Sequence, residues 1–175
     1  MNARGLHLHL LPECKGWPEI LQLLSACTGL QTSEMEILRS PEGKPRLRNN
    51  DLEFSVSHTA GTTAVLVSFE GPVGVDIERS DRRVDVLRTA PRVFEGETLE
   101  LLRANPDPRS FLKHWTRMEA LAKATGKGIT GRNLEISPQW ITLNLDLGPN
   151  WISAAAIPAT AASFEIQIKI GRAHV

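Results

Sequence analysis

The sequence predicts an α+β domain, because its apolar residues recur with the period of a strand in some stretches and with the period of a helix in others. Strand-like alternation is found near both ends of the chain and in its middle, and helical spacing fills the stretches between. The expected order is strand, helices, strands, helices, strands. This order suggests two loosely similar halves, residues 1–80 and 81–175, with a seam near Ser80.

The first third of the chain predicts one strand and two helices. Leu and His alternate from Leu6 to Leu11, which is typical of a short strand with one apolar face. A helix is expected from Pro18, a residue tolerated in a first helical turn, to Gly29, and a second short helix from Ser33 to Arg39. Residues 40–51 are rich in Pro, Gly, Asn and charge, and therefore predict a loop.

Residues 52–77 predict three short strands joined by tight turns, which together form an antiparallel meander. The clearest helix follows. It begins after Asp107, a good N-cap residue, and ends at Gly126 and Gly128. Shorter helical stretches precede it between residues 86 and 102, and strand alternation returns over residues 141–145 and again over residues 164–168.

The composition argues against several classes of function. Lys plus Arg and Asp plus Glu both number 20 in 175 residues, so the formal net charge is zero. A generic nucleic-acid binder usually has a basic excess, so an anionic ligand would have to be held by a local basic cluster. No apolar run reaches the roughly 18 residues that a membrane span requires.

The cellular location is predicted from the cysteines and the first residues. Cys14 and Cys27 lack metal-ligand spacing and suit a reducing compartment, and the start of the chain is a poor secretory signal. We therefore expect a cytoplasmic protein that binds neither membrane nor nucleic acid. The stretch from Ile170 to Val175 matches the translation of a common sequencing adapter, so we expect these residues to be non-native and without a functional role.

Two acids in the stretch VGVDIE are candidate metal ligands. Asp76 and Glu78 are two residues apart on a predicted strand, so both carboxylates project from one face. Crowded carboxylates repel each other unless a cation or a proton intervenes, and hard oxygen ligands favour Mg²⁺ over zinc. Taken alone, the motif also fits an exposed edge strand with two solvated acids.

The helix WTRMEALAKATGKG contributes a third acid. Trp115, Glu119 and Lys123 are four residues apart and share one helical stripe. Glu119 and Lys123 alone would form an ordinary surface ion pair, worth about 0.2–0.5 kcal/mol. The tryptophan argues for a site instead, because it is an unusual neighbour on a fully solvated face.

Two further pairs of residues suit phosphate binding. Ser57 and His58 lie next to each other at a strand end and face opposite ways, so they do not form the nucleophile–base pair of a hydrolase. A histidine and a hydroxyl at such an end suit a phosphate better. Lys44 and Arg46 stand in the predicted loop, where a basic group can reach a nucleotide phosphate.

Taken together and in this order, the motifs resemble those of the 4′-phosphopantetheinyl transferase superfamily. The family pattern runs from a Gly-Lys-Pro loop to a Ser-His strand end, a Gly-x-Asp-x-Glu strand and a Trp-x-x-Lys-Glu-Ala or -Ser helix, followed by a lysine and Gly-x-Gly. The match spans residues 43–128 and is specific through order and spacing. The matching residues are Gly43, Lys44, Pro45, Ser57, His58, Gly74, Asp76, Glu78, Phe94, Glu97, Trp115, Glu119, Ala120, Lys123, Gly126 and Gly128.

The resemblance implies an enzyme that uses Mg²⁺ to move phosphopantetheine from coenzyme A to a serine of an acyl or peptidyl carrier protein. Glu119 would take the proton of that serine, directly or through a water, and Lys123 would stabilise developing charge. The metal ligands would be Asp76, Glu78 and Glu119. The coenzyme A contacts would come from Lys44, Arg46, Ser57, His58 and Lys123.

The resemblance also implies two similar α+β halves, each with a small antiparallel sheet on a long helix, with the site at the seam of a monomer. The chain departs from the family pattern at Met118, where a lysine is usual. This departure motivates a second hypothesis, a relative that binds coenzyme A or a carrier protein without transfer. A third hypothesis is a metal-dependent phosphodiesterase. For the 3′-phosphate, Arg4, Lys15 and Arg39 are candidates without a positional argument.

Overall fold

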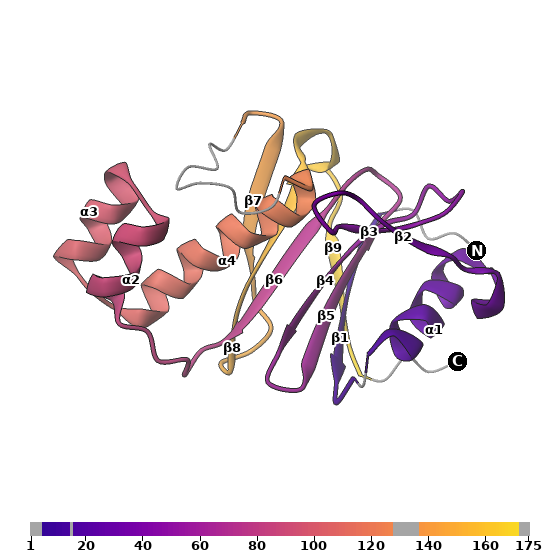
Figure 1. The fold of residues 1–175 in the computed structure, drawn as a ribbon, viewed down its shortest axis with the longest axis horizontal. Helices are drawn as coiled ribbons and strands as arrows, with labels where there is room; N and C mark the ends of the chain where they lie inside the picture. Colours follow the sequence, from indigo (N-terminus) through magenta and orange to yellow (C-terminus); the bar gives the residue numbers. More distant parts are fainter. Residues whose placement is uncertain (1–4, 15, 128–136, 172–175) are drawn as a thin grey trace.

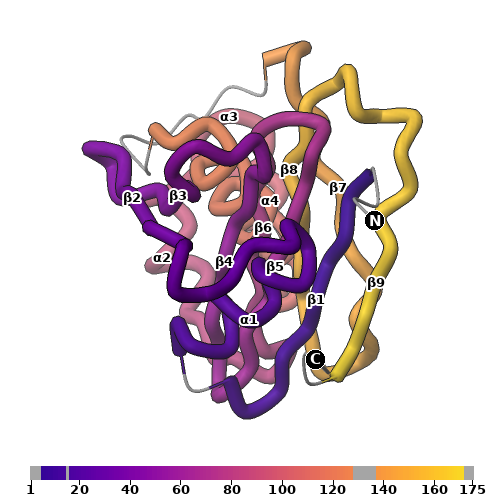
Figure 2. Tube along the Cα trace, turned by 90° about the vertical axis from the view of Figure 1, so that its right-hand side faces the viewer, coloured from indigo at the N-terminus to yellow at the C-terminus, as the bar shows by residue number. Residues whose placement is uncertain are grey.

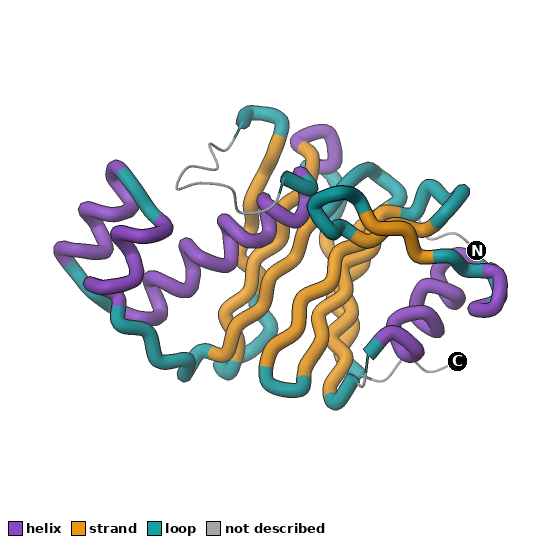
Figure 3. Tube along the Cα trace, in the orientation of Figure 1, coloured by secondary structure: helices purple, strands orange, loops and turns teal. Residues whose placement is uncertain are grey.

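A computed structural model describes residues 5–14, 16–127 and 137–171. Its strands gather in the middle of the molecule and its helices flank them (Figure 3). Among these residues, no helix has the length and apolarity needed to cross a bilayer. The elements are β1 (Leu6–Pro12), α1 (Trp17–Thr28), β2 (Ile37–Arg39), β3 (Pro45–Leu47), β4 (Glu53–Thr59), β5 (Thr62–Ser68), β6 (Gly74–Arg79), α2 (Val86–Val93), α3 (Gly96–Ala104), α4 (Pro108–Thr125), β7 (Trp140–Leu145), β8 (Trp151–Pro158) and β9 (Ile166–Ile170), with 3₁₀ turns at Thr32–Glu34 and Ala159–Ala161.

The strands form a four-stranded sheet in the order β4-β5-β1-β9, a three-stranded sheet in the order β6-β8-β7, and the small pair β2-β3. The prediction of α+β structure is confirmed. The sheets do not divide at Ser80, because β6 pairs with β8 and β9 pairs in parallel with β1 (Figure 2). The predicted three-stranded meander is therefore wrong in its third strand, since β4 and β5 pair but β6 belongs to the other sheet.

The two larger sheets meet where β4 packs beside β6. The backbone N–H of Val75 donates to Ser55 Oγ over 3.1 Å, and that of Ile77 donates to Ser57 Oγ over 3.4 Å. Buried N–H groups need partners, so the two serines satisfy an edge that would otherwise be left unpaired. Alternate residues of β6 point into an apolar core that is shared by both sheets.

Helix α4 is well defined at both ends. The carboxylate of Asp107 accepts hydrogen bonds from the backbone N–H groups of Arg109 and Ser110, which satisfies two donors of the first turn. Gly126 ends the helix in the left-handed conformation, with φ of 68°. The predicted helix from Asp107 to Gly126 is confirmed, whereas Gly128 lies outside the described residues.

The same helix lies across β6 and β8 (Figure 1). Small residues make this contact: Ala120 and Ala124 of the helix meet Ala154 and Ala156 of β8. The approach is closest at Gly74, where an added Cβ would lie 1.8 Å from the carbonyl oxygen of Ala120. Only glycine therefore allows α4 to lie at this distance from β6.

Two other predictions in the chain differ from the structure. The expected helix from Ser33 to Arg39 is limited to the 3₁₀ turn, because residues 37–39 instead pair with residues 45–47 as strands. This pairing buries part of Ile37 against the core beneath α1. Strand β8 escaped prediction because its ISAAAI stretch is buried on both faces, has no alternation, and has only Ser and Ala at its four central positions, which are not strong strand formers.

The contact at Gly74 yields a prediction about stability. Gly74→Ala should lower the free energy of unfolding by about 3 kcal/mol, the upper end of the usual cost of overpacking, because backbone on both sides must move. Urea denaturation measures this loss. Gly148→Ala is the matched control, since its new Cβ meets nothing within 4 Å and only its φ of 92° is strained. An equal loss in both variants would show that the close approach of helix and strand carries no special cost.

Candidate functional site

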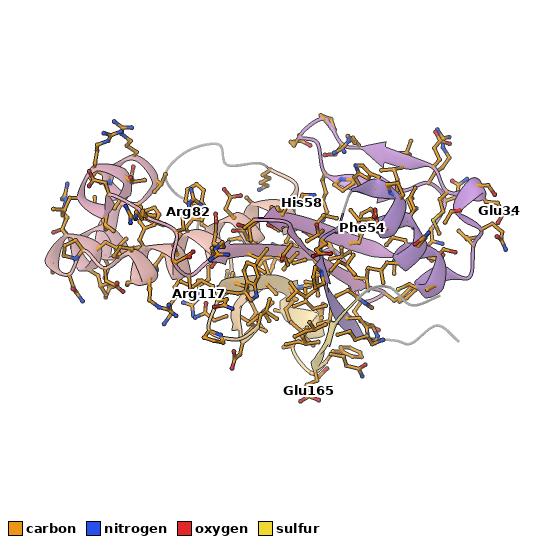
Figure 4. The ribbon with its side chains drawn as sticks, turned by 90° about the horizontal axis from the view of Figure 1, so that it is seen from below. Glu34, Phe54, His58, Arg82, Arg117 and Glu165 are labelled. Carbon is orange, nitrogen blue, oxygen red and sulfur yellow. The ribbon has the colours of Figure 1, made fainter. Side chains whose placement is uncertain are left out.

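A cavity of about 320 Å³ opens between β4 and the last turns of α4. It brings together four of the predicted site residues, which come from the loop before β3, from β4 and from α4. His58 faces this region from the large sheet, as Figure 4 indicates. Its lining includes Trp17, Arg39, Lys44, His58, Glu119 and Lys123.

Asp76 lies beneath this cavity and is only 6% exposed. Its Oδ1 accepts hydrogen bonds from Ser57 Oγ over 2.7 Å and from Lys123 Nζ over 2.8 Å. Its Oδ2 is buried and has no hydrogen-bond partner among the described residues. A buried carboxylate oxygen without a partner is costly, so this atom marks a place where a cation would be stabilised.

Lys123 reaches across to β6 rather than along its own helix to Glu119. Its Nζ donates to the carbonyl oxygen of Val75 over 3.1 Å as well as to Asp76. The ion pair is partly screened from solvent, since the Asp76 side chain is 8% exposed and that of Lys123 is 29% exposed. The ammonium group therefore has a fixed position at the edge of the cavity.

The two glutamates are shifted in the direction of proton retention. Burial raises the pKa of Glu119, the charge of Asp76 raises it further, and Lys123 opposes both effects. Burial likewise raises the pKa of Glu78, while the ion pair with Arg82 and a hydrogen bond from Trp115 oppose that rise. The charges of Asp76, Glu78 and Glu119 thus influence one another, as expected of acids that face a common space.

A divalent metal fits this donor set in chemistry, but the predicted trio is not fully assembled. Three hard carboxylates and the unpartnered oxygen of Asp76 suit a cation such as Mg²⁺. Yet within the described residues no three side chains of Asp, Glu, His or Cys lie close enough together to hold a metal ion. Glu78 is instead occupied by its ion pair with Arg82.

Lys44 links the loop before β3 to the end of α4 and to the start of β6. Its Nζ donates to the carbonyl oxygen of Ala124, near the end of α4, over 3.0 Å and to that of Val73 over 3.5 Å. It also lies 3.5 Å from a carboxylate oxygen of Glu53. Burial lowers the pKa of Lys44, and Glu53 opposes this shift. Because these contacts use all three N–H groups, a phosphate would have to replace one of them.

The other predicted phosphate ligands lie at different depths. Ser57 is buried and donates to Asp76, so the structure gives it a role in orienting that carboxylate. His58 lines the cavity, with Nδ1 at 2.8 Å from Thr63 Oγ1, and burial together with the charge of Lys123 lowers its pKa. Arg46 lies apart, in a neighbouring cavity of about 390 Å³ that also includes Lys44.

Arg39 is a lining residue for which the sequence offered no positional argument. Its guanidinium stands 5.5 Å from the ring centroid of Trp17 and donates to the carbonyl oxygen of Gly43 over 3.0 Å. These contacts hold a permanent cation at the cavity, next to the Gly-Lys-Pro loop. The contact with Trp17 joins α1 to β2 and cannot be read from local spacing. The other two candidates, Arg4 and Lys15, lie outside the described residues.

Met118 is placed in the core rather than at the cavity. It is 9% exposed and packs in the apolar cluster that includes Phe94, Phe111 and Ile152. The side chain at this position therefore stabilises the contact of α4 with the neighbouring helices. Its place in the core explains how a methionine is accommodated where a lysine is usual in the resembling family.

Comparisons with known proteins identify one family. Residues 72–167 match the 4′-phosphopantetheinyl transferase superfamily. The chain is 28% identical over 155 residues to 4′-phosphopantetheinyl transferase HetI of Nostoc sp., covering 77% of this chain and 65% of HetI. It is 32% identical over 111 residues to a putative 4′-phosphopantetheinyl transferase, slr0495, of Synechocystis sp., covering 60% and 45% of the two chains.

A third relative is 4′-phosphopantetheinyl transferase AcpT of Escherichia coli, with 38% identity over 95 residues, which cover 52% of this chain and 49% of AcpT. The matches thus span between 45% and 65% of the length of these three relatives. The segment matched by the superfamily includes both strand acids, Glu119 and Lys123. The chain belongs to the 4′-phosphopantetheinyl transferase superfamily.

Proposed function

We propose that the protein transfers 4′-phosphopantetheine from coenzyme A to a serine of an acyl or peptidyl carrier protein and releases adenosine 3′,5′-bisphosphate. The main supporting observation is the meeting of Asp76, Lys123 and Glu119 beside a cavity lined by basic side chains. Membership of the superfamily and the names of the curated relatives support the same reaction.

The cavity suits the phosphate-bearing end of coenzyme A. Arg39, His58 and Lys123 line it together with Lys44, so negative groups would meet several hydrogen-bond donors in a partly enclosed space. Its volume of about 320 Å³ is at the lower end of ligand pockets, which range from roughly 300 to 1,000 Å³. The pantetheine arm would then extend towards the surface where a carrier protein docks.

Asp76, Glu78 and Glu119 are the residues that would hold Mg²⁺. The unpartnered Oδ2 of Asp76 is the oxygen best prepared for it. When bound, the ion would neutralise charge on the diphosphate and improve the leaving group. Ser57 and Lys123 would keep the Asp76 carboxylate in one orientation, since both donate to its other oxygen.

In the proposed reaction a bond forms between the carrier serine oxygen and the β-phosphorus of coenzyme A. The bond from that phosphorus to the adenosine bisphosphate breaks, and the serine proton goes to Glu119. A carboxylate with a raised pKa is a stronger base than an ordinary one, which favours this role. Lys123 would stabilise the charge that develops on the phosphate oxygens.

The decisive test is a transfer assay read by intact-protein mass spectrometry. An apo carrier protein incubated with this protein, Mg²⁺ and coenzyme A should gain the mass of one phosphopantetheine. Glu119→Gln should slow transfer by about 10²–10⁴-fold, the usual contribution of a general base. Glu100→Gln, which changes an exposed acid paired with Arg103, should leave the rate unchanged.

A panel of acyl and peptidyl carriers without any modified member would contradict the proposal. Coenzyme A binding measured by calorimetry, together with the absence of transfer, would favour the non-catalytic relative. Hydrolysis of coenzyme A without a carrier would favour the phosphodiesterase.

The Glu119→Gln variant also tests how far the ionised form of Glu119 destabilises the folded chain. The raised pKa means that the folded chain binds the Glu119 proton more tightly than the unfolded chain. The stability from this group is therefore complete below the ordinary pKa of 4.5 and is lost as the pH rises through the raised value. Calorimetry should give the variant a higher Tm than the wild type at neutral pH. The difference should vanish at about pH 4, where both states are protonated, and a lower Tm at neutral pH would contradict this.

Arg39 provides a test of how the nucleotide is bound. If its guanidinium contacts the 3′-phosphate, Arg39→Gln should weaken binding of coenzyme A by about tenfold, the lower end for a charged hydrogen bond. Binding of 3′-dephospho-coenzyme A should change little. Calorimetric titration of both ligands makes the comparison, with Arg48→Gln, a surface arginine paired with Glu36, as the control. An equal loss for both ligands would move Arg39 away from that phosphate.

A further inference from the structure

Glu78, next to the last residue of β6, forms an ion pair with the more exposed side chain of Arg82. Its Oε1 accepts from the guanidinium of Arg82, four residues along, and the indole of Trp115 also donates to its carboxylate. The Glu78 side chain is 15% exposed, whereas that of Arg82 is 47% exposed. The mostly buried carboxylate of Glu78 is thus paired with a guanidinium group whose side chain is about half exposed to solvent.

Arg82 differs from the other arginines around it. It lines a second cavity of about 330 Å³, between the loop after β6 and the helices α2 and α4, together with Arg83 and Arg88. Figure 4 shows Arg82 on the side of the molecule that carries α2 and α3. Within the described part of the chain, only Arg82 of these three guanidinium groups forms a hydrogen bond or ion pair with a carboxylate.

The geometry of the loop does not depend on the Arg82 side chain. The turn after β6 is closed by the backbone, since the N–H of Arg82 donates to the carbonyl oxygen of Arg79 over 3.1 Å. The neighbouring pair between Arg79 and Asp81 and the bond from Ser80 Oγ to the carbonyl oxygen of Pro149 hold the same turn. The fold of this loop therefore does not require the contact between Arg82 and Glu78.

The three acids of the site are neutralised in different ways. Asp76 has a partly buried cation, Lys123, and keeps one oxygen without a partner. Glu78 forms an ion pair with Arg82, which is the more exposed of the two side chains. Because the Arg82 side chain is 47% exposed, solvent screens its side of the pair, and a divalent cation can displace it at small cost. If Arg82 leaves Glu78, water can hydrate its guanidinium, because the side chain already lies at the surface.

We propose that Arg82 is a displaceable counter-ion of Glu78 that sets the affinity of Asp76, Glu78 and Glu119 for a divalent cation. It balances the charge of Glu78 when no ion is bound, and it must leave before the Oε1 of Glu78 can contact the ion. The inference rests on the proposed function, because it takes the three carboxylates as the metal ligands.

The test is a titration of the intact protein with Mn²⁺, in which electron paramagnetic resonance measures the free ion. Arg82→Gln should bind Mn²⁺ at least about fivefold more tightly than the wild type, the lower end of typical coupling between sites. Arg83→Gln is the matched control, because it removes the same charge from the same cavity without touching Glu78. A salt concentration of about 0.15 M limits the range of unpaired charges to roughly 8 Å.

A second comparison separates displacement from general repulsion. In a Glu78→Gln background, Arg82→Gln should give no gain beyond that of Arg83→Gln, because the carboxylate to be released is missing. Equal gains for Arg82→Gln and Arg83→Gln in the wild-type background would overturn the inference, as would an unchanged or weaker affinity of Arg82→Gln. If wild type and Arg82→Gln both fail to bind Mn²⁺, the metal site of the proposed function is overturned as well. Wild-type binding that Arg82→Gln does not alter overturns this inference alone.

Discussion

The site depends on how closely helix α4 lies on strand β6. Alanines of the helix meet alanines of β8, and Gly74 lets the backbone of α4 approach β6 without an intervening side chain. At this distance the ammonium group of Lys123 reaches both Asp76 and the carbonyl oxygen of Val75. Two segments that are almost fifty residues apart in sequence thereby present their charged groups to one space. A helix held further away would separate the acids of the strand from the acid of the helix.

The residues where β4, β6 and α4 meet combine structural and chemical roles. Ser57 accepts from the backbone of β6 and donates to Asp76, so it joins the sheets and orients a carboxylate with one hydroxyl. Lys44 ties the end of α4 to the start of β6 while it lines the cavity. Stability is given up at the same place, because an oxygen of Asp76 is buried without a partner and Glu119 carries a raised pKa. Such local costs are typical of functional sites.

Local patterns in the sequence predicted the elements of the site well. The helix between Asp107 and Gly126 and the strand that carries Asp76 have strong capping signals or alternation, and both are found in the structure. Long-range pairing left no such signal. β9 pairs in parallel with β1, and β6 pairs with β8 and not with β5. Both pairings depend on apolar surface that segments distant in the sequence bury together. The ion pair between Glu78 and Arg82 was missed for a related reason: its i,i+4 spacing suggests contact only in a helix, and here it crosses a turn after a strand.

We propose that Asp76, Glu78 and Glu119 share one divalent cation beside the phosphate cavity. Anomalous diffraction at the manganese edge, from crystals grown with Mn²⁺ and coenzyme A, addresses it most directly. We expect a single strong peak at coordination distance, roughly 2.0–2.3 Å, from a carboxylate oxygen of each of the three residues and from phosphate oxygens of the ligand. A peak bound elsewhere in the protein, or coenzyme A bound in the cavity without a metal peak at these acids, would contradict it.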